Sequence, residues 1–210
     1  MYANLASLTK MHRSNQIITD IGSGGLMNFY VGPIPPSPDI APTGSLLASL
    51  ALTSPAGVSS LAMLTGIVTA PGTGGTDGTY PLTITPAAGD NGTGTVGIFT
   101  VLGGVLSTIQ ISNNGYGYAM PPTLGDFSVG GLTGATATPV MTGILVFGAI
   151  GVASGFGTGT AAFVRVSTSG GIGILDLDVG TTNAFSVIMN NTYIIAGGLV
   201  TVSADVLIEG

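Results

Sequence analysis

Apolar and polar positions alternate along most of this chain, which predicts β-strands. Near the C-terminus, Val200, Val202, Ala204, Val206 and Ile208 alternate with mostly polar neighbours, a pattern typical of a half-buried antiparallel strand. Residues 45–53 alternate in the same way and end at turn-forming residues. Further strands are expected at 26–31, 80–85, 95–102, 105–112, 126–129, 135–140, 185–189 and 193–195.

Two strands and a glycine loop are expected in the stretch 157–179. Gly170-Gly171 has the composition of a two-residue hairpin loop, because glycine tolerates the positive φ of primed turns. With this loop, Arg165 faces Asp176 and Phe163 faces Asp178. A second hairpin is predicted at Gly103-Gly104.

A single helix is predicted, over residues 4–21, with Asn4 as its N-cap and glycines from Gly22 onward as its stop signal. The positions expected near one face are Leu5, Leu8, His12, Ile18 and Ile21.

The amino-acid composition of the chain changes twice, which suggests three parts. Residues 66–141 are dominated by Gly, Thr, Pro and Asn, with short strands at regular spacing. We therefore expect an all-β protein: an N-terminal helix or arm over 1–25, a discontinuous antiparallel β-sandwich over 26–65 and 142–210, and an inserted small β-module over 66–141. A jelly roll is one candidate topology for the sandwich.

Charge is unusually scarce in this sequence. Charged residues make up 6% of the chain, with 3 basic and 9 acidic side chains and a net charge of −6, against about 25% in ordinary soluble domains. So few basic residues argue against a nucleic-acid partner. Glycines interrupt the longest apolar stretch, 144–163, so no membrane partner is expected. Copies of the chain or partner proteins would then cover much of its surface.

The sequence gives only weak evidence for nucleotide-binding, metal-binding or catalytic motifs. Gly92 to Gly97 match G-x-G-x-x-G, but a strand follows instead of the helix that a dinucleotide site requires. His12 is the only histidine, and there is no cysteine, so no metal site is expected. Asp176 and Asp178 lie on one strand face roughly 7 Å apart, yet a structural role is favoured over glycoside hydrolysis. We expect no enzymatic activity, catalytic residue or cofactor.

Arg165 is the most informative charged residue. Its neighbours Phe163, Val164 and Val166 have the pattern of a buried strand, and a buried arginine needs a carboxylate. We predict a structural ion pair with Asp176; a partner in another subunit is the alternative.

The outer segments resemble a group of small virion proteins of tailed bacteriophages. The resemblance covers residues 4–65 and about 144–208. It is carried by the segments Gly24–Val31, Pro33–Pro42, Thr43–Ala48, Gly159–Val166, Leu175–Gly180 and Asn190–Val202.

The central segment, Ile67–Pro139, is similar to Gly- and Tyr-rich β-units of phage fibre proteins. The residues that carry this similarity are Val105–Tyr118, Pro121-Pro122 and Gly134–Thr138.

The resemblance implies a structural role without catalytic residues. It implies a capsid decoration or cement protein on the virion surface, assembled in the host cytoplasm, that forms a dimer or trimer and binds the major capsid protein. The alternative is a tail or fibre component whose inserted module contacts a host glycan through Tyr80, Tyr116 and Tyr118.

Overall fold

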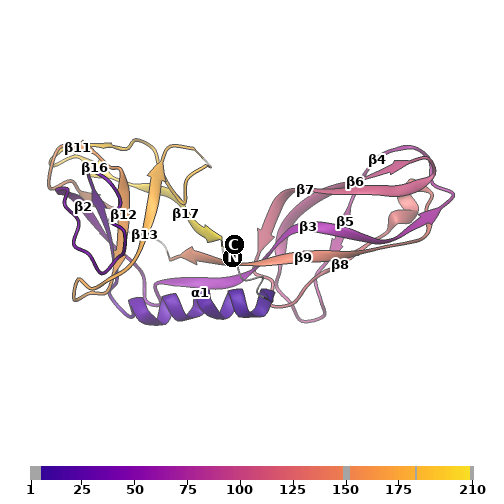
Figure 1. The fold of residues 1–210 in the computed structure, drawn as a ribbon, viewed down its shortest axis with the longest axis horizontal. Coiled ribbons are helices and arrows are strands. Elements are labelled where there is room, and N and C mark those ends of the chain that lie inside the picture. Colours follow the sequence, from indigo (N-terminus) through magenta and orange to yellow (C-terminus); the bar gives the residue numbers. More distant parts are fainter. Residues whose placement is uncertain (1–5, 149–151, 183, 209–210) are drawn as a thin grey trace. The chain divides into compact units, whose positions relative to one another are not determined.

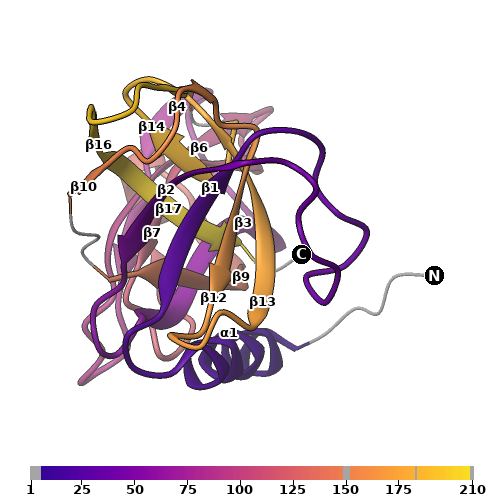
Figure 2. The same cartoon turned by 90° about the vertical axis from the view of Figure 1, so that its left-hand side faces the viewer.

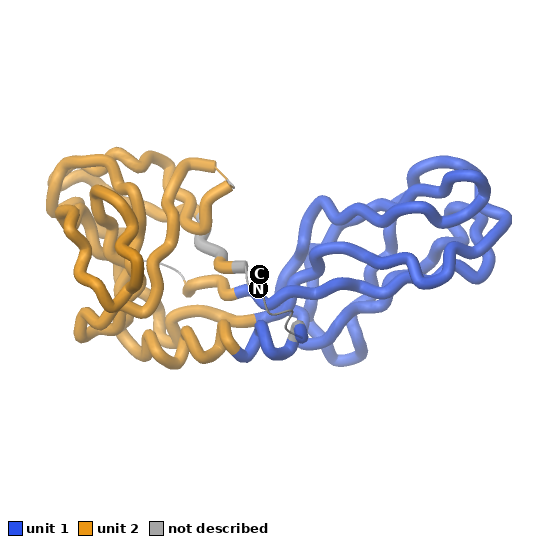
Figure 3. Tube along the Cα trace, in the orientation of Figure 1, with its two compact units in different colours: residues 1–12, 60–144, 209–210 blue, residues 13–59, 145–208 orange. Residues whose placement is uncertain are grey.

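The protein is mostly β, with one short N-terminal helix and a curled multi-stranded sheet (Figure 1). The computed structural model describes residues 6–148, 152–182 and 184–208. These residues cluster into two compact units (Figure 3): residues 60–144 with the start of the helix in unit 1, and residues 13–59 with 145–208 in unit 2.

The elements that build unit 2, some of them shared with unit 1, are α1 Ser7–Ile21, β1 Leu26–Tyr30, β2 Leu46–Ala51, β3 Gly57–Thr73, β9 Thr133–Phe147, β10 Ala153–Ser154, β11 Gly159–Thr160, β12 Phe163–Ser167, β13 Gly173–Gly180, β14 Val187–Met189, β15 Tyr193–Ile194, β16 Leu199–Val200 and β17 Val202–Ile208. The other elements of unit 1 are β4 Gly78–Pro81, β5 Thr83–Thr85, β6 Thr93–Leu102, β7 Val105–Tyr116, β8 Thr123–Gly125 and the 3-10 helix η1 Phe127–Gly130.

One eight-stranded sheet organises unit 2, in the order β2-β1-β12-β13-β14-β17-β9-β3. Strands β1, β12 and β13 run side by side in Figure 2. The sheet is mixed because β13 and β14 pair in parallel, so the expectation of a purely antiparallel sheet is wrong at this point. Its core includes Phe29, Leu50, Val164 and Val166, all 1% exposed or less.

Unit 1 is a β-module with its own core around Phe99, Tyr118 and Leu61. Strands β4, β6 and β7 form a three-stranded sheet, and β5 pairs with β8. The predicted hairpin at Gly103-Gly104 is confirmed: Leu102 pairs with Val105, and both glycines have positive φ.

The buried face of α1 matches the expected one at Ile21 and at the partly buried Ile18, but not at Leu8 and His12. Ser14 and Ile21 are buried, whereas Leu8 is 52% exposed and His12 is exposed. His12 lies nine positions before Ile21, which at about 100° per residue places it on the opposite side of the helix. Asn4 and Leu5 lie outside the described residues.

The C-terminal segment departs from the predicted alternation. It forms two strands, β16 and β17, and Leu207, expected on the polar face, is partly buried against the core. Val200 is buried and Val202 is partly buried. Ala204, Val206 and Ile208 lie outside the side chains that the structure describes.

Candidate functional site: a polar cluster and an apolar surface on unit 2

The hairpin of β12 and β13 places Arg165 directly opposite Asp176, and Phe163 opposite Asp178. The loop itself is not the predicted Gly170-Gly171 pair. It has three residues, Ser169 to Gly171, because Thr168 N–H donates to Ile172 O (2.9 Å) and Gly171 N–H to Thr168 O (3.0 Å). Ser167 then pairs with Gly173 but Val166 pairs with Leu175, so Ile174 forms a bulge that restores the predicted register.

Arg165 and Asp176 form a bidentate ion pair. Nε of Arg165 donates to Oδ1 of Asp176 at 2.7 Å, and Nη2 donates to Oδ2 at 2.6 Å. Both side chains are buried, 6% and 5% exposed. The hydrogen bonds to Asp176 raise the pKa of the guanidinium above its ordinary value, against the effect of burial.

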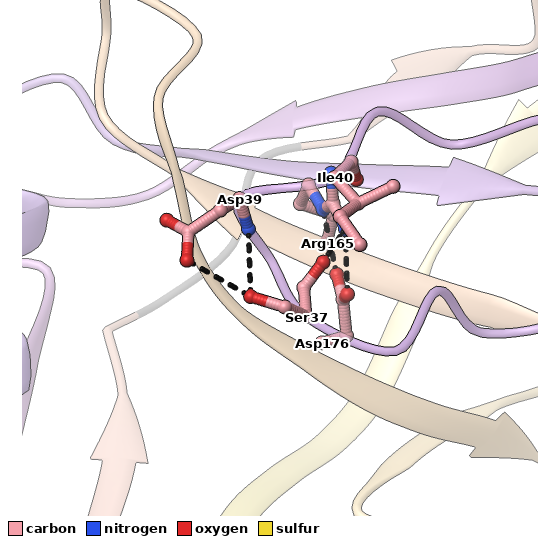
Figure 4. A network of polar contacts seen from close by, with 5 residues as sticks. All are labelled: Ser37, Asp39, Ile40, Arg165 and Asp176. Atoms are coloured by element: carbon pink, nitrogen blue, oxygen red, sulfur yellow. Dashed lines mark hydrogen bonds and ion pairs between the residues drawn. The ribbon is translucent and has the colours of Figure 1, made fainter.

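The same guanidinium holds the proline-rich loop between β1 and β2. Nη1 donates to the carbonyl of Ile40 at 2.7 Å, and Nη2 lies 3.4 Å from the carbonyl of Ser37 (Figure 4). The sequence gives no signal for these two acceptors, because every residue type has a backbone carbonyl. Arg165 therefore fixes both the hairpin and the loop.

Asp178 does not join this cluster. Its Oδ1 accepts a hydrogen bond from the backbone N–H of Ser186 at 2.9 Å. The two aspartates thus have separate structural contacts. Within the described residues, no group of three or more His, Cys, Asp or Glu side chains could hold a metal ion.

The three tyrosines considered for glycan contact do not present a shared aromatic surface. Tyr118 is 2% exposed and its hydroxyl lies 2.9 Å from Oγ1 of Thr95, so it belongs to the core of unit 1. Tyr80 is partly buried, stacks on Phe99 and donates to the carbonyl of Thr76. Only Tyr116 is largely exposed, at 58%.

The glycines of the G-x-G-x-x-G match serve packing. A side chain at Gly92 would overlap the ring of Tyr118, and Gly94 has a φ of +79°. Strand β6 begins at Thr93, so no helix N-terminus follows the glycines to hold a phosphate.

An exposed apolar surface lies elsewhere on unit 2, where residues 152–156 meet residues 193–199. Its large side chains are strongly exposed: Val152 60%, Phe156 64%, Tyr193 50%, Ile195 57% and Leu199 75%. We refer to these five residues as the apolar surface. Residues 152–157 and 190–201 contain no charged side chain.

Backbone hydrogen bonds hold the two segments of the apolar surface together. Gly155 N–H donates to Gly198 O and Gly197 N–H donates to Gly155 O, both at 2.8 Å. A Cβ at Gly155 would lie 2.6 Å from the carbonyl oxygen of Ile195, so only glycine permits this approach. A cavity of about 350 Å³ opens beside it, lined in part by Asn190, Tyr193 and Leu199.

No helix among the described residues is long and apolar enough to cross a membrane. No protein-family model, curated protein or solved structure matches the chain.

Proposed function

We propose that this chain is a structural virion protein that decorates or cements the capsid of a tailed bacteriophage as a homo-oligomer. The observation that carries the proposal is the apolar surface, which exposes five large side chains from two chain segments that contain no charged residue. Exposed apolar side chains grouped in this way mark a contact surface, and burying them desolvates no ion.

Two further features support a structural role. The few charged groups near the hairpin are engaged in holding strands and a loop, as the Arg165–Asp176 pair illustrates. The resemblance of the outer segments to phage virion proteins points in the same direction. The finer arrangement of the sheet, a sandwich of jelly-roll type, belongs to this proposal as well.

Such a protein would act by burying its apolar surface against the capsid shell and against other copies of itself. Contacts made only with the assembled shell stabilise that shell by mass action, as any ligand specific for one state does. The major capsid protein and further copies of this chain are the proposed partners.

Two substitutions test the surface directly. Phe156→Asp and Leu199→Asp should each weaken binding to purified capsids about tenfold or more, because each buries a charge at the contact. Ile34→Asp is the matched control, since Ile34 is also exposed, at 47%, but lies in the proline-rich loop. Cosedimentation with capsids gives the measurement.

Microscopy of intact particles separates this proposal from the alternative. A decoration protein gives many copies spread over the capsid, whereas a fibre component gives few copies at the tail. Equal capsid binding by all three variants, or density confined to the tail, would contradict the proposal.

A further inference from the structure

A cleft on unit 2 lies between the proline-rich loop and the face of β1 and β12 that carries Asn28, Tyr30 and Arg165. It has a volume of about 520 Å³ and is lined by side chains that include Asn28, Tyr30, Asp39, Arg165, Ser167 and Ile172. Sites for small molecules have volumes of about 300 to 1,000 Å³. The cleft is therefore large enough for a small ligand.

The polar groups of the cleft retain hydrogen-bonding capacity. Nδ2 of Asn28 donates to Oγ of Ser167 at 2.9 Å, and within the described residues Oδ1 of Asn28 accepts no bond. Nη1 of Arg165 donates to Ile40 O, and its second N–H has no acceptor in the described part of the chain. Asp39 binds Ser37 Oγ through Oδ2 at 2.9 Å, and Oδ1 accepts nothing from the described residues.

The charge balance of the cleft argues against an anionic ligand. Asp176 already neutralises Arg165 through the bidentate pair, and Asp39 adds a negative charge. An anion would meet a carboxylate whose repulsion nothing offsets. An uncharged ligand with hydroxyl groups could donate to Asp39 and Asn28 and accept from Arg165.

An aromatic ring completes the lining. Tyr30 stacks on Phe163, with ring centroids 5.4 Å apart, so its position is fixed by packing. Saccharides combine hydroxyl groups with an apolar C–H face, which suits a site that places an aromatic ring beside carboxylate, amide and guanidinium groups.

We propose that this cleft binds a neutral saccharide unit, with Asp39, Asn28 and Arg165 as the hydrogen-bonding groups and Tyr30 as the aromatic contact. The inference goes beyond the proposed function and does not depend on it, because a capsid-bound protein and a free one would present the same cleft. It also differs in place from the tyrosines of unit 1.

Saturation-transfer NMR on the purified full chain tests the proposal. The probes are methyl α-glucoside, methyl α-galactoside and N-acetylglucosamine, each at millimolar concentration, with N-acetyl-lysine methylamide as a cationic probe. We expect transfer to at least one sugar. Asp39→Asn and Asn28→Ala should each weaken its binding about tenfold, because the first replaces a charged carboxylate acceptor by an amide and the second removes the side-chain amide.

Asp20→Asn is the matched control, because it makes the same chemical change at an exposed position of helix α1 and should leave binding unchanged. Melting temperatures within a few degrees of the parent show that the variants fold. Three results would overturn the proposal. No sugar receives saturation transfer, or the cleft variants transfer as much as the parent, or the lysine probe alone receives transfer that depends on Asp39. Capsid binding is measured separately by cosedimentation, so a failure of the saccharide proposal can be distinguished from a failure of the capsid proposal.

Discussion

Arg165 illustrates how much a single residue can determine in this chain. Its guanidinium bonds one carboxylate and two loop carbonyls, and the side chain is only 6% exposed. The carboxylate partner could be predicted, because a charge in an apolar strand requires compensation. The loop carbonyls could not, since they depend on how residues 37–40 fold back over the sheet.

Removing Arg165 should destabilise the protein strongly. Arg165→Met leaves the Asp176 carboxylate buried without a partner, and we expect a loss of about 3–5 kcal/mol in the free energy of unfolding, measured in urea. Arg165→Met with Asp176→Leu should recover much of this loss, because no buried charge remains. A double variant no more stable than Arg165→Met would contradict this account.

Asp90 is a second residue whose role depends on distant backbone. Its carboxylate accepts hydrogen bonds from the N–H groups of Gly92, Ala119 and Met120 at 2.8 to 3.2 Å. Burial acts to raise the pKa of Asp90, but these backbone donors, with that of Asn91, lower it below its ordinary value. Nothing in the sequence connects Asp90 with residues 119 and 120, so this contact could not be predicted.

The lowered pKa of Asp90 makes its contribution dependent on pH. The stabilisation is fully present above the ordinary carboxyl pKa of about 4 and is lost as the pH falls through the lower folded value. We expect Asp90→Asn to reduce the free energy of unfolding by about 1–2 kcal/mol at pH 7. The difference from the parent should shrink below pH 4. A difference that is the same at pH 7 and pH 2.5 would argue against the carboxylate as its source.

The β12–β13 hairpin has the predicted register, but its loop length and its bulge were not predicted. The loop is one residue longer than expected, and the bulge at Ile174 adds one residue to β13, so Arg165 still faces Asp176. Loop glycines alone do not distinguish a two-residue turn from a three-residue turn that ends in a left-handed residue.

A pair of glycine substitutions tests the loop geometry. Gly171 has a φ of +86°, whereas the backbone of Gly170 lies outside the left-handed region. Gly171→Ala should therefore lower the free energy of unfolding by about 1–2 kcal/mol. Gly170→Ala, its neighbour and control, should leave it unchanged or raise it by up to about 1 kcal/mol. Equal effects at the two positions would favour the two-residue turn.

Two other elements escaped prediction for identifiable reasons. Strand β3 runs through Gly66, Pro71 and Gly72, which sequence patterns treat as strand breaks. Residues 126–129 have the composition of a strand, but Asp126 adopts a φ of +55° and the chain turns into η1. Aspartate tolerates this left-handed conformation, so the alternation of Phe127 and Val129 is misleading there.

At the scale of the whole molecule, two separate cores should respond separately to substitution. Phe99 is fully buried in unit 1 and Phe29 in unit 2. Each Phe→Ala change should destabilise its own unit by about 3–5 kcal/mol. Hydrogen exchange should show faster exchange in residues 60–144 for Phe99→Ala, and in 13–59, 145–148, 152–182 and 184–208 for Phe29→Ala. Uniformly faster exchange in both variants would indicate a single cooperative unit.

Strands β3 and β9 lead into and out of unit 1, and their residues 60–73 and 133–144 belong to it, yet the two strands are neighbours in the eight-stranded sheet that contains most strands of unit 2. In the topology of that sheet, the rest of unit 1 is a long connection between two adjacent strands. Closing a longer connection adds only about 0.6 kcal/mol for each doubling of its length. Unit 1 should therefore be replaceable by another folded segment. An epitope, an enzyme or another binding module inserted between β3 and β9 would turn the chain into a scaffold for protein display.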